Sequence, residues 1–218
     1  MGAVARSAVQ PGGNCQLCPR LVAFRRDWRS REPSWFNAPV PSFGPRDARL
    51  LIVGLAPGLR GANRTGRPFT GDYAGDLLYA TLKEFGFAQG NYEARTDDGL
   101  ALIDCRITNA VRCVPPENKP TPQEILTCRK FLTATIGEMA KLRAVVALGR
   151  IAHETFVAAH GAQRSDHPFS HGAAQAMGAI KLFDSYHCSR LNTSTGVLTP
   201  KMFREVLARV RKHLDAIP

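Results

Sequence analysis

Apolar residues recur along this 218-residue chain with two spacings, and each spacing predicts a different kind of element. Four short apolar runs, stopped by glycine, proline or polar residues, predict buried β-strands. They lie at residues 49–53, 102–107, 144–148 and 180–185. Apolar residues spaced three or four apart predict helices between and around these runs. The helical segments are 20–29, 77–85, 121–139, a stretch through His153 and Phe156, and 203–214.

Strand and helix alternate four times, which is typical of a parallel sheet with helices on both faces. The predicted fold class is therefore α/β, a three-layer α/β/α arrangement around a central four-stranded, mainly parallel sheet. Ligands of such sheets bind outside the carboxyl ends of the strands. The segments that follow the strands are 54–72, 108–113, 149–150 and 187–195, and three of them are rich in Gly, Asn, Ser, Thr and His.

The chain is basic, with 29 Lys and Arg against 18 Asp and Glu, a net charge of +11. The excess concentrates in residues 1–32, in residues 44–72 and in the last eighteen residues. This distribution favours a polyanionic partner, although a solvated basic surface explains the charge alone equally well. With 44% hydrophobic residues, the composition excludes a disordered or low-complexity protein. No apolar run suits a signal peptide or a membrane span, so we expect a cytoplasmic protein without a membrane partner.

Six cysteines are unusual in a reducing compartment. Cys15 and Cys18 form a C-x-x-C pair, and Cys113 and Cys128 form a second, wider pair. Four thiolates brought together by folding suit Zn²⁺ or an iron–sulfur cluster, and spacing alone does not distinguish the metals. The alternative is a redox C-x-x-C pair with incidental core thiols elsewhere. Cys105 is expected to be a core thiol on a strand.

Residues 54–58 (Gly-Leu-Ala-Pro-Gly) open a loop that runs to Thr70-Gly71-Asp72. The loop lacks both the Gly-Lys-Ser/Thr of a P-loop and the G-x-G-x-x-G of a dinucleotide site, so by itself it can equally be a tight structural loop. Three further segments accompany it, at residues 107–116, 147–149 and 186–196. Together the four segments closely resemble the uracil-DNA glycosylase superfamily, and within it the type b (fifth) family of iron–sulfur members.

The resemblance covers roughly residues 15 to 210, with the motifs in the family order. It implies one domain over residues 1–218, holding a [4Fe-4S] cluster that looks structural. The implied cluster ligands are Cys15, Cys18, Cys113 and Cys128, so iron now outweighs zinc. The cluster would tie the N-terminal segment, about residues 1–45, to the loop after Asn109.

The resemblance also implies roles for five side chains around an extruded base. Phe69 matches the aromatic residue that stacks on the base, and Asn109 matches the amide that reads or orients it. His187 matches the histidine near the base's carbonyl oxygen, and Asp72 looks like the catalytic carboxylate. Leu191 lies where related enzymes carry a wedge residue that fills the vacated stack. The implied base pocket comprises Gly54, Ala56, Gly58, Phe69 and Asn109. The expected DNA contacts are Arg60, Arg64, Arg67, Ser189, Arg190, Leu191 and Asn192.

The chain departs from the family pattern at three positions. Ala56 replaces the aspartate that positions water in the best-known uracil-specific relatives, and in the type b enzymes Asp72 looks like its compensation. Gly58 replaces a bulky tyrosine that excludes the methyl group of thymine, which predicts a roomier pocket. Cys188 replaces a proline and leaves the placement of the wedge open. Asp72 could instead merely cap a helix, and Asn109 could bond its own strand end.

The expected function is that of a monofunctional DNA glycosylase in base excision repair. It would act as a monomer, associated with the nucleoid when on DNA, and would flip uracil out of duplex DNA and hydrolyse its N-glycosidic bond. Hypoxanthine and ethenocytosine are further candidate substrates. No lysine lies in the motifs to attack the sugar, so no lyase activity is expected. The alternatives are a non-catalytic or covalently trapping binder of uracil-containing DNA on the same fold, and an iron–sulfur electron carrier unrelated to DNA.

Overall fold

A computed structural model describes residues 10–217 of the chain. Five strands form the central sheet in the order β4-β1-β5-β7-β6, and all neighbours are parallel except β6 and β7. The strands of this sheet are β1 (Leu50–Gly54), β4 (Cys105–Asn109), β5 (Ala144–Leu148), β6 (Ala174–Met177) and β7 (Ile180–Ser185). A separate antiparallel pair consists of β2 (Ala88–Gln89) and β3 (Ala101–Leu102).

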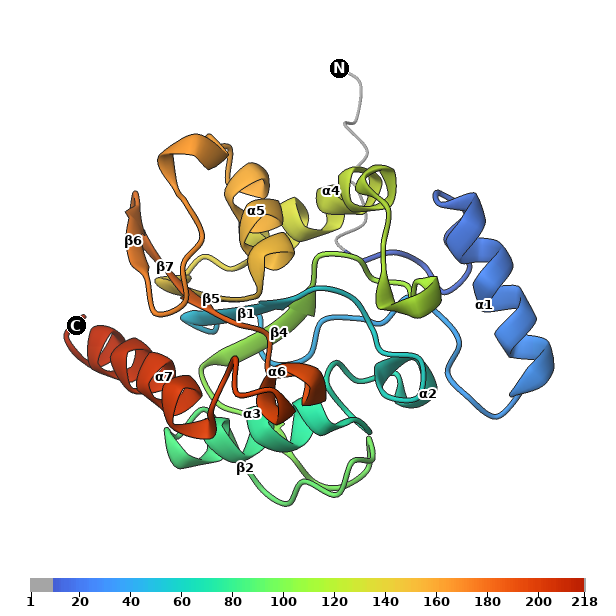
Figure 1. The fold of residues 1–218 in the computed structure, drawn as a ribbon, viewed down its shortest axis with the longest axis horizontal. Coiled ribbons are helices and arrows are strands. Elements are labelled where there is room, and N and C mark those ends of the chain that lie inside the picture. Colours follow the sequence, from blue (N-terminus) through green and yellow to red (C-terminus); the bar gives the residue numbers. More distant parts are fainter. Residues whose placement is uncertain (1–9, 218) are drawn as a thin grey trace.

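Helices cover both faces of the sheet, so the predicted three-layer α/β/α class is confirmed. Figure 1 shows α4 and α5 on one side of the sheet and α3 and α7 on the other. The helices are α1 (Pro19–Arg31), α2 (Ala62–Thr65), α3 (Tyr73–Glu84), α4 (Pro122–Glu138), α5 (Arg150–Ala159), α6 (Arg190–Ser194) and α7 (Pro200–Asp215), with short 3-10 turns at Pro116–Asn118 and Arg164–Asp166. Among residues 10–217, no helix is long and apolar enough to cross a membrane.

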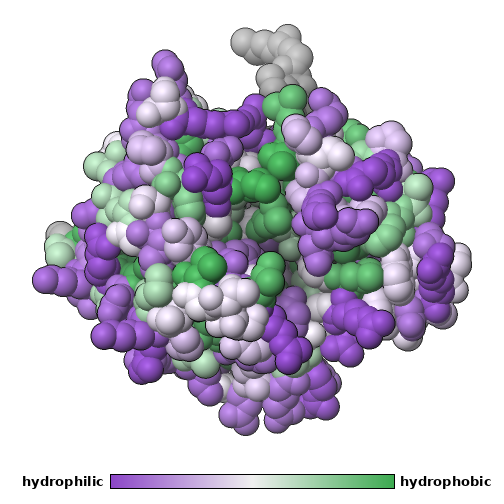
Figure 2. All heavy atoms as spheres, viewed as in Figure 1, coloured by the Kyte–Doolittle hydropathy of each residue, from purple (hydrophilic) through white to green (hydrophobic). Residues whose placement is uncertain are grey.

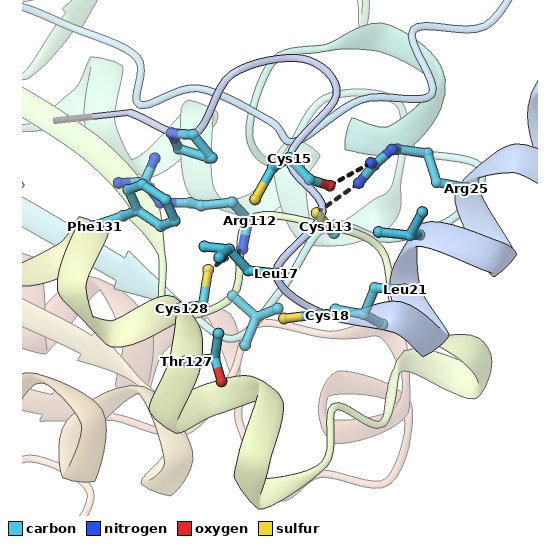
Figure 3. Close-up of a pocket in the computed structure, with 13 residues that line it drawn as sticks. Cys15, Leu17, Cys18, Leu21, Arg25, Arg112, Cys113, Thr127, Cys128 and Phe131 are labelled. Carbon is cyan, nitrogen blue, oxygen red and sulfur yellow. Dashed lines mark hydrogen bonds between the residues drawn. The ribbon is translucent and has the colours of Figure 1, made fainter. Parts of the chain in front are cut away.

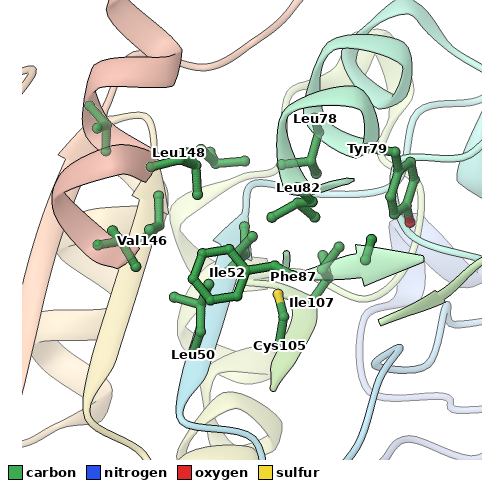
Figure 4. Packing of buried hydrophobic residues seen from close by; sticks show 14 of the residues in the cluster. Leu50, Ile52, Leu78, Tyr79, Leu82, Phe87, Cys105, Ile107, Val146 and Leu148 are labelled. Atoms are coloured by element: carbon green, nitrogen blue, oxygen red, sulfur yellow. The ribbon is translucent and has the colours of Figure 1, made fainter. Parts of the chain in front are cut away.

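The period of two along a strand divides the core into two layers. In β1, Leu50 and Ile52 join the cluster under α3 and α7, whereas Leu51 and Val53 join the cluster under α4 and α5. All residues of β1 are buried, which is why the run is apolar without alternation. Figure 4 shows the first cluster, with Phe87 reaching under α3 toward the strands.

Two details of the strand prediction are wrong. The predicted strand at 102–107 is divided by Asp104, whose φ of 51° lies in the left-handed region, so β3 ends before it and β4 begins after it. The sheet also has a fifth strand, because β6 pairs antiparallel with β7 at the edge. Only Met177 of β6 is buried, so its sequence carries little strand pattern.

The N-terminal segment packs on the body through a small third core. Leu21 of α1 belongs to this core together with Val111, which follows β4, and Phe131 of α4. The cysteines predicted to bind a metal, Cys15, Cys18, Cys113 and Cys128, all belong to this core or pack against it. Cys105 is fully buried on β4, as expected of a core thiol.

Candidate active site

A pocket of about 500 Å³ opens at the carboxyl ends of β1, β4 and β7. Figure 2 shows this face of the molecule hollowed near its centre, with hydrophobic side chains around the hollow and hydrophilic ones farther out. The structure therefore brings together most of the predicted site residues from four separate segments. The predicted residues on its walls are Ala56, Gly58, Phe69, Asp72, Asn109, His187, Ser189, Arg190 and Leu191.

Asn109 ends β4 and lies beside Gly54, its register partner at the end of β1. The Asn109 side chain is only 3% exposed, and its Oδ1 atom has no hydrogen-bond partner within residues 10–217. Unpaired buried oxygens are costly, so this atom is suited to accept a hydrogen bond from a bound ligand. A Cβ on Gly54 would come within 2.4 Å of Asn109 Oδ1, so this position has room only for glycine while Asn109 keeps its place.

Phe69 has a φ of 53°, a strained value for a bulky side chain that costs about 1–3 kcal/mol. Its ring is 7% exposed and lines the pocket. The ring also stacks near that of His187, with the centroids 5.9 Å apart and the planes inclined by 28°. The strained backbone therefore delivers an aromatic face to the pocket beside the histidine.

His187 follows β7 in the loop that leads to α6. Burial lowers the pKa of its imidazole to about 4, so the ring is neutral near neutral pH. Asn192 fixes the loop, because its Nδ2 donates to the carbonyl oxygen of His187 at 2.8 Å. Cys188 is fully buried, and its thiol donates to the carbonyl oxygen of Ala74 in α3 at 3.5 Å. Asn192 and Cys188 thus anchor the loop on both sides of the His187–Cys188 peptide.

Asp72 is the N-cap of α3, where its Oδ1 accepts from the backbone N–H of Gly75 at 3.1 Å. The carboxylate also lines the pocket, so capping and a role in the pocket are compatible. Burial is the main cause that raises the pKa of Asp72 above its ordinary value. A Cβ on Gly58 would lie 3.0 Å from Asp72 Oδ2, and a Cβ on Gly61 only 2.4 Å from it. Both glycines therefore leave space for this carboxylate.

Leu191 stands at the rim of the pocket, in the first turn of α6, and is 70% exposed. Ser189 caps that helix by accepting from the N–H of Asn192 at 3.3 Å. Arg60, Arg64 and Arg190 are exposed, and Arg190 also lines the pocket next to Leu191.

Arg67 is the exception among the expected DNA contacts, and for this residue the prediction is wrong. Its side chain is buried, at 4% exposure, and forms an ion pair with Asp98 at 2.7 Å. A guanidinium that is held in this way is not available to a phosphate at the surface.

Sequence reasoning missed four polar residues of the pocket wall: Tyr73, Glu117, Asn118 and Lys119. The last three belong to the turn after Pro115-Pro116, where Glu117 and Asn118 both have positive φ, at 54° and 57°. The proline-rich sequence marks a turn, but nothing local indicates that the turn returns to the pocket. Lys119 is exposed there and forms an ion pair with Glu117 at 3.2 Å.

The four predicted metal ligands surround a second, small pocket between α1, α4 and the segment after β4 (Figure 3). All four thiols are free. Burial is the main cause that raises the pKa of Cys113 to about 12. In the part of the chain that the structure describes, no three histidine, cysteine or acidic side chains are arranged to hold a single metal ion.

Two buried arginines adjoin these cysteines, Arg25 and Arg112, each 1% exposed. Arg25 Nη1 donates to Cys113 Sγ at 3.2 Å, and the backbone N–H of Arg112 donates to Cys128 Sγ at 3.3 Å. Neither guanidinium forms an ion pair with a carboxylate of residues 10–217. Buried cations need a compensating charge, and thiolates bound to a metal centre would supply it, so the donor set fits an anionic iron–sulfur site.

Comparisons with known proteins show the family of the chain. The sequence model of the uracil DNA glycosylase superfamily matches residues 41–211. A type-5 uracil-DNA glycosylase of Thermus thermophilus is 48% identical over 205 residues, which cover 91% of this chain and 93% of that protein. A type-5 uracil-DNA glycosylase of Pyrobaculum aerophilum is 40% identical over 200 residues, covering 90% and 87% of the two chains. The crystal structure of Pedobacter heparinus SMUG2 superposes with a TM-score of 0.48 at 14% identity, over 78% of this chain and 76% of that one.

Proposed function

The chain belongs to the uracil-DNA glycosylase superfamily, and from this membership we propose that it removes uracil from DNA by hydrolysing the N-glycosidic bond. It would act as a monofunctional glycosylase in base excision repair. The observation that carries the proposal is the shared pocket, in which Phe69, Asp72, Asn109 and His187 line a single space. Each of these side chains corresponds to one requirement of the reaction.

Breaking the bond leaves positive charge on the sugar and negative charge on the departing base. The Asp72 carboxylate, which lines the pocket while its Oδ1 caps α3, would stabilise the sugar cation and orient the attacking water. Neutral His187 would donate a hydrogen bond to the base oxygen on which negative charge develops. A preorganised donor of this kind contributes about 3–4 kcal/mol to transition-state stabilisation.

Asn109 would select the base. Uracil has an N–H at its N3 position, and the unpaired Oδ1 of Asn109 can accept a hydrogen bond from it. Cytosine has no hydrogen on this nitrogen and would leave the buried oxygen unpaired. A site built to hydrogen-bond one substrate group rejects analogues that lack the group, because the buried polar atom then stays unsatisfied.

The proposed substrate form is duplex DNA with the target nucleotide flipped out, bound by the protein as a monomer. Extrusion costs a few kcal/mol, and stacking on Phe69 would offset about 1–3 kcal/mol of that cost. Exposed Leu191 would fill the vacated stack. Arg60, Arg64 and Arg190 would contact phosphates around the pocket rim.

Hypoxanthine and ethenocytosine are proposed as further substrates, because Gly58 places no methyl-excluding side chain on the pocket wall. A lyase step is not proposed, although the structure adds one lysine to the pocket edge. The ammonium of Lys119 is paired with Glu117, outside the motif residues. Borohydride trapping of the wild type and of Lys119→Ala tests this point, and a covalent adduct that depends on Lys119 would show lyase chemistry.

The deciding experiment measures free-base release from duplexes that contain uracil, hypoxanthine, a thymine mismatch or ethenocytosine. Release of uracil without strand cleavage is the expected result. Tight retention of uracil-containing DNA without release would instead identify a non-catalytic binder, and a complex that survives denaturant would identify a covalently trapping one. Salt-independent behaviour and no affinity for duplex would favour an electron carrier.

The proposed cofactor is a [4Fe-4S] cluster on Cys15, Cys18, Cys113 and Cys128, which would tie the N-terminal segment to the body within one domain. In a four-iron cluster each thiolate binds a different iron, so the position of all four cysteines around one small pocket supports the proposal. The buried Arg25 and Arg112 would balance the negative charge. Metal analysis tests the assignment: iron with inorganic sulfide in a brown protein supports it, and stoichiometric zinc in a colourless protein would contradict it.

A further inference from the structure

The ion pair between Arg67 and Asp98 is buried and bidentate. Arg67 Nη1 donates to Asp98 Oδ1 at 2.8 Å, and Nη2 donates to Oδ2 at 2.7 Å. Asp98 also accepts from the backbone N–H groups of Glu93 at 3.0 Å and Leu100 at 3.1 Å. The guanidinium holds the pKa of the Asp98 carboxyl well below its usual range. Desolvating a buried ion pair can cost as much free energy as the pair gains, so stability alone does not explain why these two charges are buried together.

The pair adjoins the turn at residues 67–71, which we call the Phe69 turn. Arg67 Nε donates to Thr70 Oγ1 at 2.8 Å. The Tyr92 hydroxyl donates to the carbonyl oxygen of Phe69 at 3.2 Å and accepts from the N–H of Gly71 at 3.4 Å. A single hydroxyl therefore bonds the backbone on both sides of Thr70.

The surroundings of Arg67 connect these contacts into one unit. Its guanidinium lies over the rings of Phe43, Tyr79 and Tyr92, at 5.4, 5.6 and 5.8 Å from their centroids. The Tyr79 hydroxyl donates to the carbonyl oxygen of Pro68 at 2.6 Å. Arg67 and Asp98 thereby fix the position from which Tyr92 bonds the turn.

Phe69 needs such support because its left-handed backbone is unfavourable for a bulky residue. Strained conformations of this kind persist only where the surrounding structure over-determines them, and they cluster at functional sites. A relaxed turn would rotate the ring away from Asn109 and His187, which it now adjoins.

We infer that Arg67, Asp98 and Tyr92 are positioning residues, and that they act by holding the Phe69 ring in the orientation that stacks on the extruded base. This inference rests on the proposed function. Arg67 acts from the interior and makes no contact with phosphate. The three residues are called the Phe69 brace below.

A double-mutant cycle tests the brace with Tyr92→Phe, which removes one oxygen atom, and Phe69→Ala. The measurement is binding to a duplex that carries a C-linked uracil analogue, which cannot be hydrolysed, alongside binding to a duplex with an abasic site. We expect Tyr92→Phe to weaken analogue binding about 5- to 10-fold, as partial loss of base stacking would. Abasic-site binding should stay unchanged, and the same substitution should have no effect in the Phe69→Ala protein.

Asp98→Asn should reproduce the Tyr92→Phe pattern, and Asp97→Asn, at the exposed neighbouring acid, is its matched control. Equal weakening of both duplexes, or an undiminished effect in the Phe69→Ala background, would overturn the inference. If Asp98→Asn does not fold, Tyr92→Phe still decides the question. Failure of the proposed function is a separate result, namely no uracil release by the wild type, and it leaves the binding cycle readable.

Discussion

Gly54 is the position where one added methyl group should disturb recognition most. A Cβ there would lie 2.4 Å from Asn109 Oδ1 and 2.6 Å from Phe69 Cζ, where ordinary contacts begin near 3.4 Å. Gly54→Ala must therefore displace one or both side chains by roughly 1 Å. A misplacement of this size costs about 10²-fold in rate.

The fold should tolerate the same substitution, because the backbone of Gly54 does not have positive φ. Overpacking typically lowers the free energy of unfolding by about 1–3 kcal/mol. The assay is single-turnover uracil release from a duplex, with urea unfolding measured on the same preparations. Gly137→Ala is the matched control, since its Cβ would have nothing within 4 Å and lies in α4. The control should keep full activity and gain up to about 1 kcal/mol.

Uracil release by Gly54→Ala within about twofold of the wild type would refute the reasoning. That result would mean that Asn109 and Phe69 can move without consequence, and the tight fit between the ends of β1 and β4 would have no part in recognition. A rate loss shared by Gly137→Ala would point to a general effect of the alanine exchange.

Four further predictions address other parts of the site. Asp72→Asn keeps a cap-forming side chain but removes the charge, so uracil release should fall by about 10²-fold or more while binding of uracil-containing DNA, measured by anisotropy, changes little. Because burial lowers the pKa of His187 from 6.5 to about 4, the wild type should lose unfolding free energy as the pH falls through that window, and urea titrations of His187→Gln should show a smaller loss. Leu191→Ala should slow release from duplex more than from single-stranded DNA, where no stack has to be filled. Cys113→Ser should lower the iron content and the thermal midpoint together, as measured by metal analysis and calorimetry.

The strands that the sequence predicts well are those buried on both faces. The runs at 49–53 and 144–148 correspond to β1 and β5. A short apolar run bounded by polar or turn-forming residues is typical of a buried strand. Asp104 escaped prediction because its left-handed backbone depends on a tertiary contact, in which its Oδ1 accepts from the N–H of Arg49 at 2.7 Å. The edge strand β6 escaped because its mostly exposed residues carry no apolar pattern.

Site residues could be predicted where a motif segment directly follows a predicted strand. Asn109 ends β4 and His187 follows β7, whereas Asp72 closes the motif segment that follows β1, and the structure brings all three to one pocket. Arg67 shows where the rule fails, since a basic residue in a glycine-rich loop looks exposed from the sequence. Its partner Asp98 lies 31 residues away, and no local pattern connects the two. The same holds for Lys119, which reaches the pocket only through the path of the chain after β4.

Asp72 both caps α3 and lines the pocket. These two roles limit which substitutions the position can accept during evolution. Most replacements would remove the cap together with the carboxylate, and loss of the cap costs about 0.5–2 kcal/mol of stability. Asparagine and serine are different, because either can still close the helix. A descendant could therefore lose the chemistry in one step and keep its folded, DNA-facing surface. Homologues that retain Asn109 and Phe69 but carry Asn or Ser at this position are the natural place to look for proteins that recognise a lesion without removing it.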